Sequence, residues 1–208
     1  MKLNFKQGRG NKIHIHVDGE YKMTVDSDFI AAGGYFENMN ISETELAALE
    51  DAVSSRRAFN KAVELLSRRD HSKGELLTKL RQKGFSEGAE EAVEKLEEYG
   101  YVDDYRFAKM FSGELARLKK YGKSRIKQEL YKKGVSRDII DSVLEEIEFD
   151  SESLVSVIEK KYFRNLDSEK GVKKTVNALL RMGYSYSEIK EALNVVKIKL
   201  EETDDFID

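Results

Sequence analysis

Apolar and polar positions follow two different periods along this chain. Within roughly the first 36 residues they alternate, over Lys12–Val17 and again over Tyr21–Val25, on either side of the turn-forming pair Asp18-Gly19. Alternation around such a turn predicts a β-hairpin, and Leu3–Lys6 is a candidate further strand. Because a lone hairpin is marginal in water, we expect it to pack on a helix or to pair elsewhere.

From about residue 42 to residue 199 the apolar period is helical. Ser42 and Glu45 form a capping-box pattern, and Leu46, Leu49 and Val53 follow on one helical face. Three later helices share one ending: a leucine, a glycine four residues on, then an apolar residue and a serine. The copies are Leu80-Arg-Gln-Lys-Gly84-Phe-Ser86, Leu130-Tyr-Lys-Lys-Gly134-Val-Ser136 and Leu179-Leu-Arg-Met-Gly183-Tyr-Ser185.

Each position of this ending has a physical role. The leucine is the last core residue, the glycine adopts the left-handed conformation that stops the helix, the apolar residue covers the helix end, and the serine caps the next helix. Since the glycines are 50 and 49 residues apart, we expect three tandem three-helix repeats, which must stack or dock because units this small support little core alone. The predicted fold is mainly α and elongated, with a small N-terminal β-hairpin. Its predicted parts are a β-hairpin region (1–40), a connecting helix (41–57), three repeats (58–104, 105–153 and 154–200) and an acidic tail (201–208).

Charge is segregated along the chain, and an excess of positive charge collects in residues 105–135. This stretch has ten cations against two glutamates, a formal balance of +8, whereas the whole chain carries −3. Its apolar residues Phe107, Phe111, Leu115 and Leu118 fall at helical spacing, which predicts an apolar side turned inward and a cationic side turned outward. Such a surface suits a polyanion, although lysine-rich runs also occur simply as solvated faces.

Repeats 1 and 2 share the same charge order, a cationic helix pair followed by an acidic third helix. We therefore expect one positive stripe across both repeats. Its candidate binding residues are Arg68, Arg69, Lys73, Lys79, Arg81, Lys83, Arg106, Arg117, Lys119, Lys120, Lys123, Arg125, Lys127, Lys132 and Lys133.

Several classes of protein lack support in the sequence. No apolar run approaches the roughly 18 residues that span a bilayer, the N-terminus lacks a signal-peptide core and there is no cysteine, so we expect a soluble, cytoplasmic protein. His14 and His16 share a strand face, but without a third ligand nearby we interpret them as ordinary strand residues. Asp103-Asp104 is better placed to cap a helix than to act as a catalytic pair. With no nucleotide-binding loop either, we expect no enzyme, no cofactor and no metal.

Three stretches together resemble the RecX family, the modulators of the bacterial recombinase RecA. They are Ala62–Ser72 with the following Glu75-Leu76, Lys79-Leu80 and Lys83-Gly84-Phe85, then Gly100–Ala108, then Gly122-Lys-Ser-Arg-Ile126 with Glu129-Leu130 and Lys133-Gly134-Val135. With the weaker third repeat, the resemblance covers about residues 58–200. Between Phe111 and Gly122 family members are usually richer in arginine, whereas here Ser112-Gly113-Glu114 interrupts the basic stretch. The resemblance does not extend to the hairpin or the tail.

The resemblance implies three tandem three-helix repeats and a regulatory role in recombination, DNA repair and the SOS response. Family members lie in the helical groove of RecA filaments and suppress ATP hydrolysis, strand exchange and coprotease activity, and some bind DNA directly. We therefore expect a monomer that inhibits RecA filaments by occupying a surface, with RecA and single-stranded DNA or the RecA–DNA complex as partners. The alternative is a DNA-binding protein with tandem helix-turn-helix-like units.

Within the basic stretch, Arg125 is the best candidate for a bidentate contact with phosphate or carboxylate, flanked by Lys123 and Lys127. Tyr121 and Tyr131 are either stacking platforms for exposed bases or, more commonly for such tyrosines, partly buried packing residues.

Overall fold

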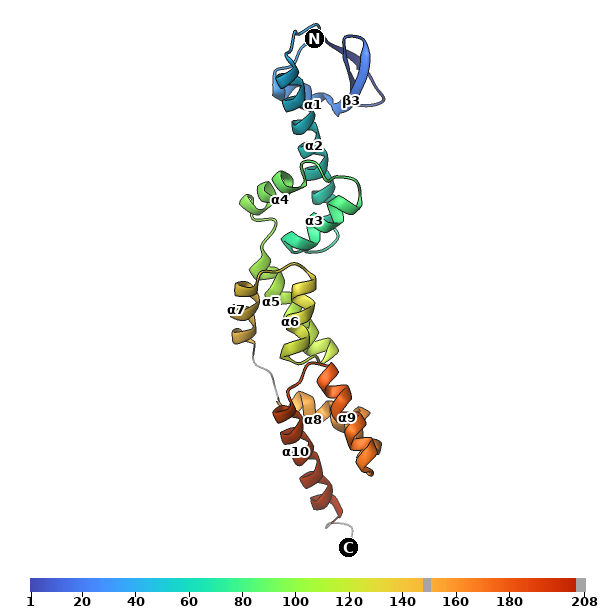
Figure 1. Ribbon diagram of the computed structural model, residues 1–208, viewed down its shortest axis with the longest axis vertical. Coiled ribbons are helices and arrows are strands. Elements are labelled where there is room, and N and C mark those ends of the chain that lie inside the picture. Colours follow the sequence, from blue (N-terminus) through green and yellow to red (C-terminus); the bar gives the residue numbers. More distant parts are fainter. Residues whose placement is uncertain (148–150, 205–208) are drawn as a thin grey trace. The chain divides into compact units, whose positions relative to one another are not determined.

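The structure is a computed structural model that describes residues 1–147 and 151–204, and it is mainly helical with a small N-terminal sheet, as predicted (Figure 1). The chain divides into two compact units, Met1–Leu65 with Lys79–Leu96, and Leu66–Thr78 with Glu97–Asp208. In chain order the elements are β1 (Leu3–Gln7), β2 (Lys12–Val17), β3 (Glu20–Asp26), α1 (Ser27–Gly33), α2 (Glu43–Leu66), α3 (Lys73–Gln82), α4 (Ala89–Glu98), α5 (Asp104–Glu114), the π-helix η1 (Leu115–Lys119), α6 (Lys123–Lys132), α7 (Arg137–Glu146), α8 (Ser151–Lys161), the 3₁₀-helix η2 (Phe163–Asn165), α9 (Glu169–Arg181) and α10 (Tyr186–Asp204).

The predicted hairpin is confirmed, and the candidate further strand joins it as β1. The three strands form an antiparallel sheet in the order β1-β2-β3. Asp18 and Gly19 have φ values of 50° and 88°, the positive angles that a tight two-residue hairpin turn requires. The sheet does not stand alone, because its buried residues share a core with Leu49 and Val53 of α2.

Helix α2 begins with the predicted capping box. The backbone N–H of Ser42 donates to the Glu45 carboxylate at 2.7 Å, and the N–H of Glu45 donates to Ser42 Oγ at 3.2 Å. The helix then runs without a break to Leu66. The segment predicted as a connecting helix and the first helix of repeat 1 are therefore one continuous helix.

Two helix triplets lie within the second unit, each around its own core. Helices α5, α6 and α7 lie together around Phe107, Ile126 and Ile140, and α8, α9 and α10 lie together around Ile158 and Leu179 (Figure 1). Helix α10 continues through Asp204, so the first half of the predicted acidic tail is helical. Residues 205–208 of that tail lie outside the described residues.

The three predicted glycine endings have the expected geometry. Gly84, Gly134 and Gly183 have φ values of 83°, 75° and 95°. At each ending the residue after the glycine donates its N–H to the carbonyl of the repeat's leucine, at 3.0, 3.3 and 3.3 Å in chain order. These bonds satisfy carbonyls that would otherwise be unpaired at the helix end.

The predicted serine caps are confirmed at one of the three endings. Ser185 makes a full capping box, donating its N–H to Glu188 at 2.6 Å and accepting from the N–H of Glu188 at 3.2 Å. Ser136 occupies the N-cap position of α7, but within the described residues its side chain makes no capping bond. Ser86 is not a cap at all, because Gly88, with φ 72°, precedes the start of α4 and brings the backbone against Ser55 of α2.

Within the second unit, the starts of α3 and α6 are each bonded to the end of another helix in the same way. Where α3 begins, Ser72 Oγ donates to the carbonyl of Lys133 at the end of α6. Where α6 begins, the N–H of Gly122 donates to the carbonyl of Met182 at the end of α9, at 2.8 Å. Lys133 and Met182 each directly precede the glycine that ends a helix. The start of α3 is therefore bonded to the glycine turn that ends α6, and the start of α6 to the glycine turn that ends α9.

Candidate functional site

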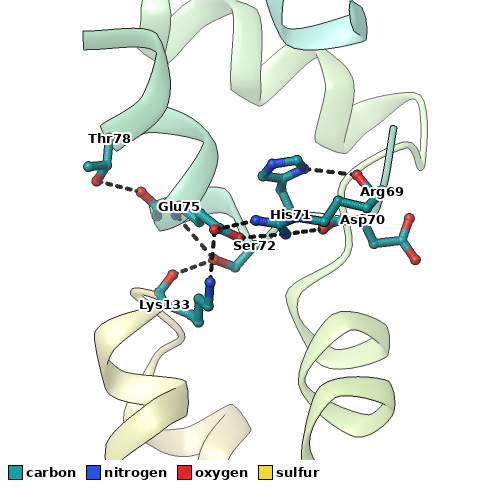
Figure 2. Close-up of polar contacts among 8 residues, drawn as sticks. Arg69, Asp70, His71, Ser72, Glu75, Thr78 and Lys133 are labelled. Carbon is teal, nitrogen blue, oxygen red and sulfur yellow. Dashed lines mark hydrogen bonds and ion pairs between the residues drawn. The ribbon is translucent and has the colours of Figure 1, made fainter. Parts of the chain in front are cut away.

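Glu75 links two of the candidate binding cations into one cluster (Figure 2). Its carboxylate receives two hydrogen bonds from the Arg69 guanidinium, at 2.6 and 3.0 Å, and one from Lys133 Nζ at 2.8 Å. The Glu75 side chain is 12% exposed. Burial alone would raise its pKa, but the hydrogen bonds and charges of Arg69 and Lys133 outweigh burial and lower the pKa to about 2.

The backbone around this cluster is also fixed by polar contacts. Ser72 Oγ, which donates to the Lys133 carbonyl, accepts from the N–H of Glu75 at 3.1 Å and so caps α3. The N–H of Lys73 donates to Asp104 at 2.7 Å, and the Lys73 ammonium pairs with Glu97 at 2.6 Å. Arg69, Lys73 and Lys133 therefore have a structural role, through their contacts with Glu75, Asp104 and Glu97.

Other candidate cations are held in ion pairs on their own helices or on a neighbouring one. Within the second unit, Arg125 and Lys132 both pair with Glu129, each at 2.9 Å, and Lys127 pairs with Asp141 of α7. In the first unit, Arg81 pairs with Glu90. Ion pairs of this exposed kind contribute little to stability, but each one also offsets positive charge that a polyanion would otherwise meet.

Arg125, the predicted bidentate residue, is the most constrained of these. Its guanidinium lies over the Tyr121 ring, 5.6 Å from the centroid, and its Nε is buried with no hydrogen-bond partner among the described residues. Tyr121 packs against the core of its triplet, which favours the packing interpretation for that tyrosine. Tyr131 is 44% exposed.

Four of the candidate cations that have no ion pair within the described residues lie in one short segment. Six candidate residues have no ion pair in the part of the chain that the structure describes: Lys79 and Lys83 of the first unit, and Arg117, Lys119, Lys120 and Lys123 of the second. Arg106 donates a hydrogen bond to the carbonyl of Gly100 at 3.5 Å. The Arg68 side chain is exposed. We call residues 117–123 the basic turn. It runs from η1 to the start of α6. Four cations without an ion pair in the described residues lie within its seven positions.

The basic turn begins within a π-helix that the sequence analysis did not predict. Residues Leu115–Lys119 form η1, and Lys120 ends it with φ 54°, in the left-handed region. A π turn is wider than an α turn, so the residues after it lose the α-helical phase. Leu118 was expected on the inward face with Leu115, but Leu115 is buried whereas Leu118 is 57% exposed. That expectation was wrong, because apolar spacing alone does not reveal a π turn.

Neither a group of metal ligands nor a membrane-spanning helix is found among the described residues. No group of three potential ligands lies close enough to hold a metal ion there, and His14 instead contacts Thr24 Oγ1 at 2.6 Å. No described helix is both long and apolar enough to cross a bilayer. Asp103 caps α5 as predicted, accepting from the N–H of Arg106 at 2.9 Å.

Comparisons with known proteins agree with this architecture. Residues 58–101 match the family model described as RecX, first three-helix domain, and residues 103–144 match the one described as RecX, second three-helix domain. The regulatory protein RecX of Caldanaerobacter subterraneus subsp. tengcongensis is 35% identical over 191 residues, which cover 91% of this chain and 96% of that protein. The chain belongs to the RecX family.

Other RecX proteins extend the likeness. The regulatory protein RecX of Clostridium acetobutylicum is 28% identical over 204 residues, covering 94% of each chain. Two RecX crystal structures share the fold. The first has a TM-score of 0.68 and 21% sequence identity, and the match covers 93% of this chain and 98% of that chain. The second, RecX from Lactobacillus salivarius, has a TM-score of 0.63 and 23% sequence identity, and the match covers 71% of this chain and 99% of that chain. As a RecX protein, the chain is a regulator, a modulator of RecA, and not an enzyme. The expected regulatory, non-enzymatic role is confirmed.

Proposed function

We propose that this RecX protein inhibits RecA by lying in the helical groove of the RecA filament, where it suppresses ATP hydrolysis and strand exchange. It acts as a cytoplasmic monomer, and its cationic residues meet either acidic patches on RecA or the phosphates of DNA bound within the filament. Occupying a surface needs neither a catalytic group nor a cofactor, which suits a chain whose candidate residues are almost all surface cations.

The single observation that carries this proposal is the basic turn. Arg117, Lys119, Lys120 and Lys123 have no carboxylate partner within the described residues, so their charge is available to a partner. The N–H groups of Gly122 and Ser124 at the start of α6 already donate to the carbonyls of Met182 and Gly183, so the side chains of the basic turn, and not the helix end, would attract an anionic partner. Among the fifteen candidate residues, these four are therefore the strongest, while Arg69, Arg125, Lys127 and Lys133 contribute less because internal partners hold them.

The direct test is ATP hydrolysis by the cognate RecA on single-stranded DNA, titrated with this protein at two salt concentrations. Suppression well below one protein per RecA subunit would indicate blocked filament growth, and suppression only near one-to-one would indicate coating of the groove. Absence of suppression at either salt concentration would contradict the proposal.

The contribution of the basic turn is tested by Lys119→Glu/Lys123→Glu. We expect this variant to suppress ATP hydrolysis much more weakly, because two exposed attractive charges become repulsive. A matched control is Lys174→Glu/Lys190→Glu, which makes the same charge change at exposed positions of α9 and α10. Equal losses in both variants would mean that net charge, and not the basic turn, determines inhibition.

The alternative is a protein that binds DNA directly through its helix pairs. The same basic turn supports it, because exposed lysine and arginine side chains are the usual contacts to DNA phosphates. Fluorescence anisotropy with labelled DNA distinguishes the two. Tight binding to bare DNA without any effect on RecA would favour the alternative.

A further inference from the structure

A groove in the second unit lies beside the basic turn and has an apolar floor. It has a volume of about 830 Å³ and is formed by α5, η1 and the segment before α3. Its floor contains Phe107 and Phe111 together with Met110 and Leu118, and the last two are 59% and 57% exposed. Two large apolar side chains that are this exposed in one groove are typical of a contact surface.

The π-helix η1 is the reason that this floor exists. In a continuous α-helix Leu118 would share the buried face of Leu115, as its spacing predicts. The wider turn moves Leu118 off that face, where it lines the groove with Met110. Single π turns within helices occur frequently at functional sites.

The floor suits an aliphatic or aromatic side chain better than a nucleobase. Bases stack on open aromatic planes, but the Phe111 ring is already covered. Phe107 stacks on it with centroids 5.5 Å apart, and Lys133 Nζ lies 5.6 Å from its centroid. The most exposed apolar residues of the groove are Met110 and Leu118, and a methionine side chain adapts readily to an apolar partner.

The charged side chains along the groove leave one cation without an ion pair among the described residues, Arg117. Four cations line it, Arg69, Lys109, Arg117 and Lys133, against the carboxylates of Asp70 and Glu114. Glu75 holds Arg69 and Lys133, and Glu146 holds Lys109 at 2.8 Å. Arg117 has no ion pair within the part of the chain that the structure describes, and its planar guanidinium suits a carboxylate.

We propose that this groove docks an acidic protein segment that carries one bulky apolar side chain. The apolar side chain packs between Met110 and Leu118, and a neighbouring carboxylate pairs with Arg117. The inference rests on the proposed function in one respect: the protein that presents the segment is RecA in its filament. It assigns the contact at this groove, which includes Arg117 and Leu118 at the start of the basic turn, to protein and leaves phosphate contacts to Lys119, Lys120 and Lys123.

The test compares binding to two purified partners, the cognate RecA filament assembled on single-stranded DNA with a slowly hydrolysed ATP analogue, and the same DNA alone. Met110→Ser/Leu118→Ser removes the apolar floor without changing charge, at positions whose exposure makes misfolding improbable. Leu180→Ser is the matched control, since Leu180 is 42% exposed on α9. Circular dichroism verifies that each variant is folded.

We expect the double variant to bind the filament roughly ten-fold more weakly, as loss of an interface anchor does, with DNA binding and the Leu180→Ser control unchanged. Arg117→Gln should also weaken filament binding, and by less as salt rises. Unchanged filament binding by the double variant would overturn the inference, and so would an equal loss of DNA binding, which would make the groove a nucleic-acid site. Failure of the unaltered protein to bind the filament would overturn the proposed function together with the inference.

Discussion

Glu75 shows how much of the positive charge in this chain is already used inside the molecule. Two cations that look available in the sequence, Arg69 and Lys133, converge on this one carboxylate. We expect Glu75→Gln to destabilise the protein by roughly 1–2 kcal/mol, well below the value that the full pKa shift implies, because solvent screens part of the interaction. Urea unfolding measures the loss. Glu169→Gln is the control, since its pair with Lys173 is exposed on both sides and should contribute almost nothing.

The same residue predicts a pH dependence with a definite sign. The pKa of Glu75 is lowered from 4.5 to about 2 in the folded protein, so the folded state holds this carboxyl deprotonated where the unfolded state does not. The stabilisation from Glu75 is therefore complete above about pH 4.5 and is lost as the pH falls towards 2. The stability difference between the unaltered protein and Glu75→Gln should shrink over that range in urea titrations. A difference that stayed constant down to pH 2 would contradict this account.

Counting charges in the sequence could locate the basic stretch but could not rank its members. Arg125 and Lys119 look equivalent in a list of cations, yet Arg125 is held by Glu129 and covers Tyr121 while Lys119 is unpaired within the described residues. The difference arises from helix geometry and from partners on other helices, such as Asp141 for Lys127. The sequence alone therefore does not show which of these cations have an ion-pair partner in the folded protein.

At the scale of elements, glycines make the close approach between the start of α3 and the end of α6 possible. A Cβ on Gly74 would lie 2.8 Å from the Cα of Gly134, a backbone atom that cannot move aside easily. We expect Gly74→Ala to cost roughly 1–3 kcal/mol, as overpacking usually does, although alanine is the better helix former. Thermal or urea unfolding of the purified variant measures it.

Gly113→Ala is the matched control, because a Cβ at this helical position of α5 meets nothing within 4 Å. It should stabilise the protein by about 0.5–1 kcal/mol, the ordinary gain of alanine over glycine within a helix. If Gly74→Ala were also stabilising, the contact between Gly74 and Gly134 would have no energetic role.

Most helices and their ends followed from local rules that a sequence does contain. The capping box at Ser42 and the left-handed glycines at 84, 134 and 183 depend on residues close in sequence, so their patterns predicted them correctly. The π-helix η1 could not be predicted in this way. No residue type demands a π turn, and Leu118 has the spacing of a core residue while its side chain is exposed. The groove was missed for the same reason.

At the scale of the whole molecule, attraction by charge and docking by shape predict different responses to salt. Contacts between cations and phosphates release counterions, so the logarithm of the binding constant falls with the logarithm of the salt concentration in proportion to the number of contacts. The apolar floor of the groove contributes no such term, because burying Met110 and Leu118 displaces water and not ions.

Filament binding measured over a series of salt concentrations therefore separates the two surfaces. Lys119→Gln/Lys123→Gln should make the salt dependence shallower, by up to about 1.4 in the slope of the double-logarithmic plot where both lysines meet phosphates of single-stranded DNA. Met110→Ser/Leu118→Ser should lower affinity by the same factor at every salt concentration and leave the slope unchanged. An unchanged slope in the lysine variant would mean that Lys119 and Lys123 meet no phosphates.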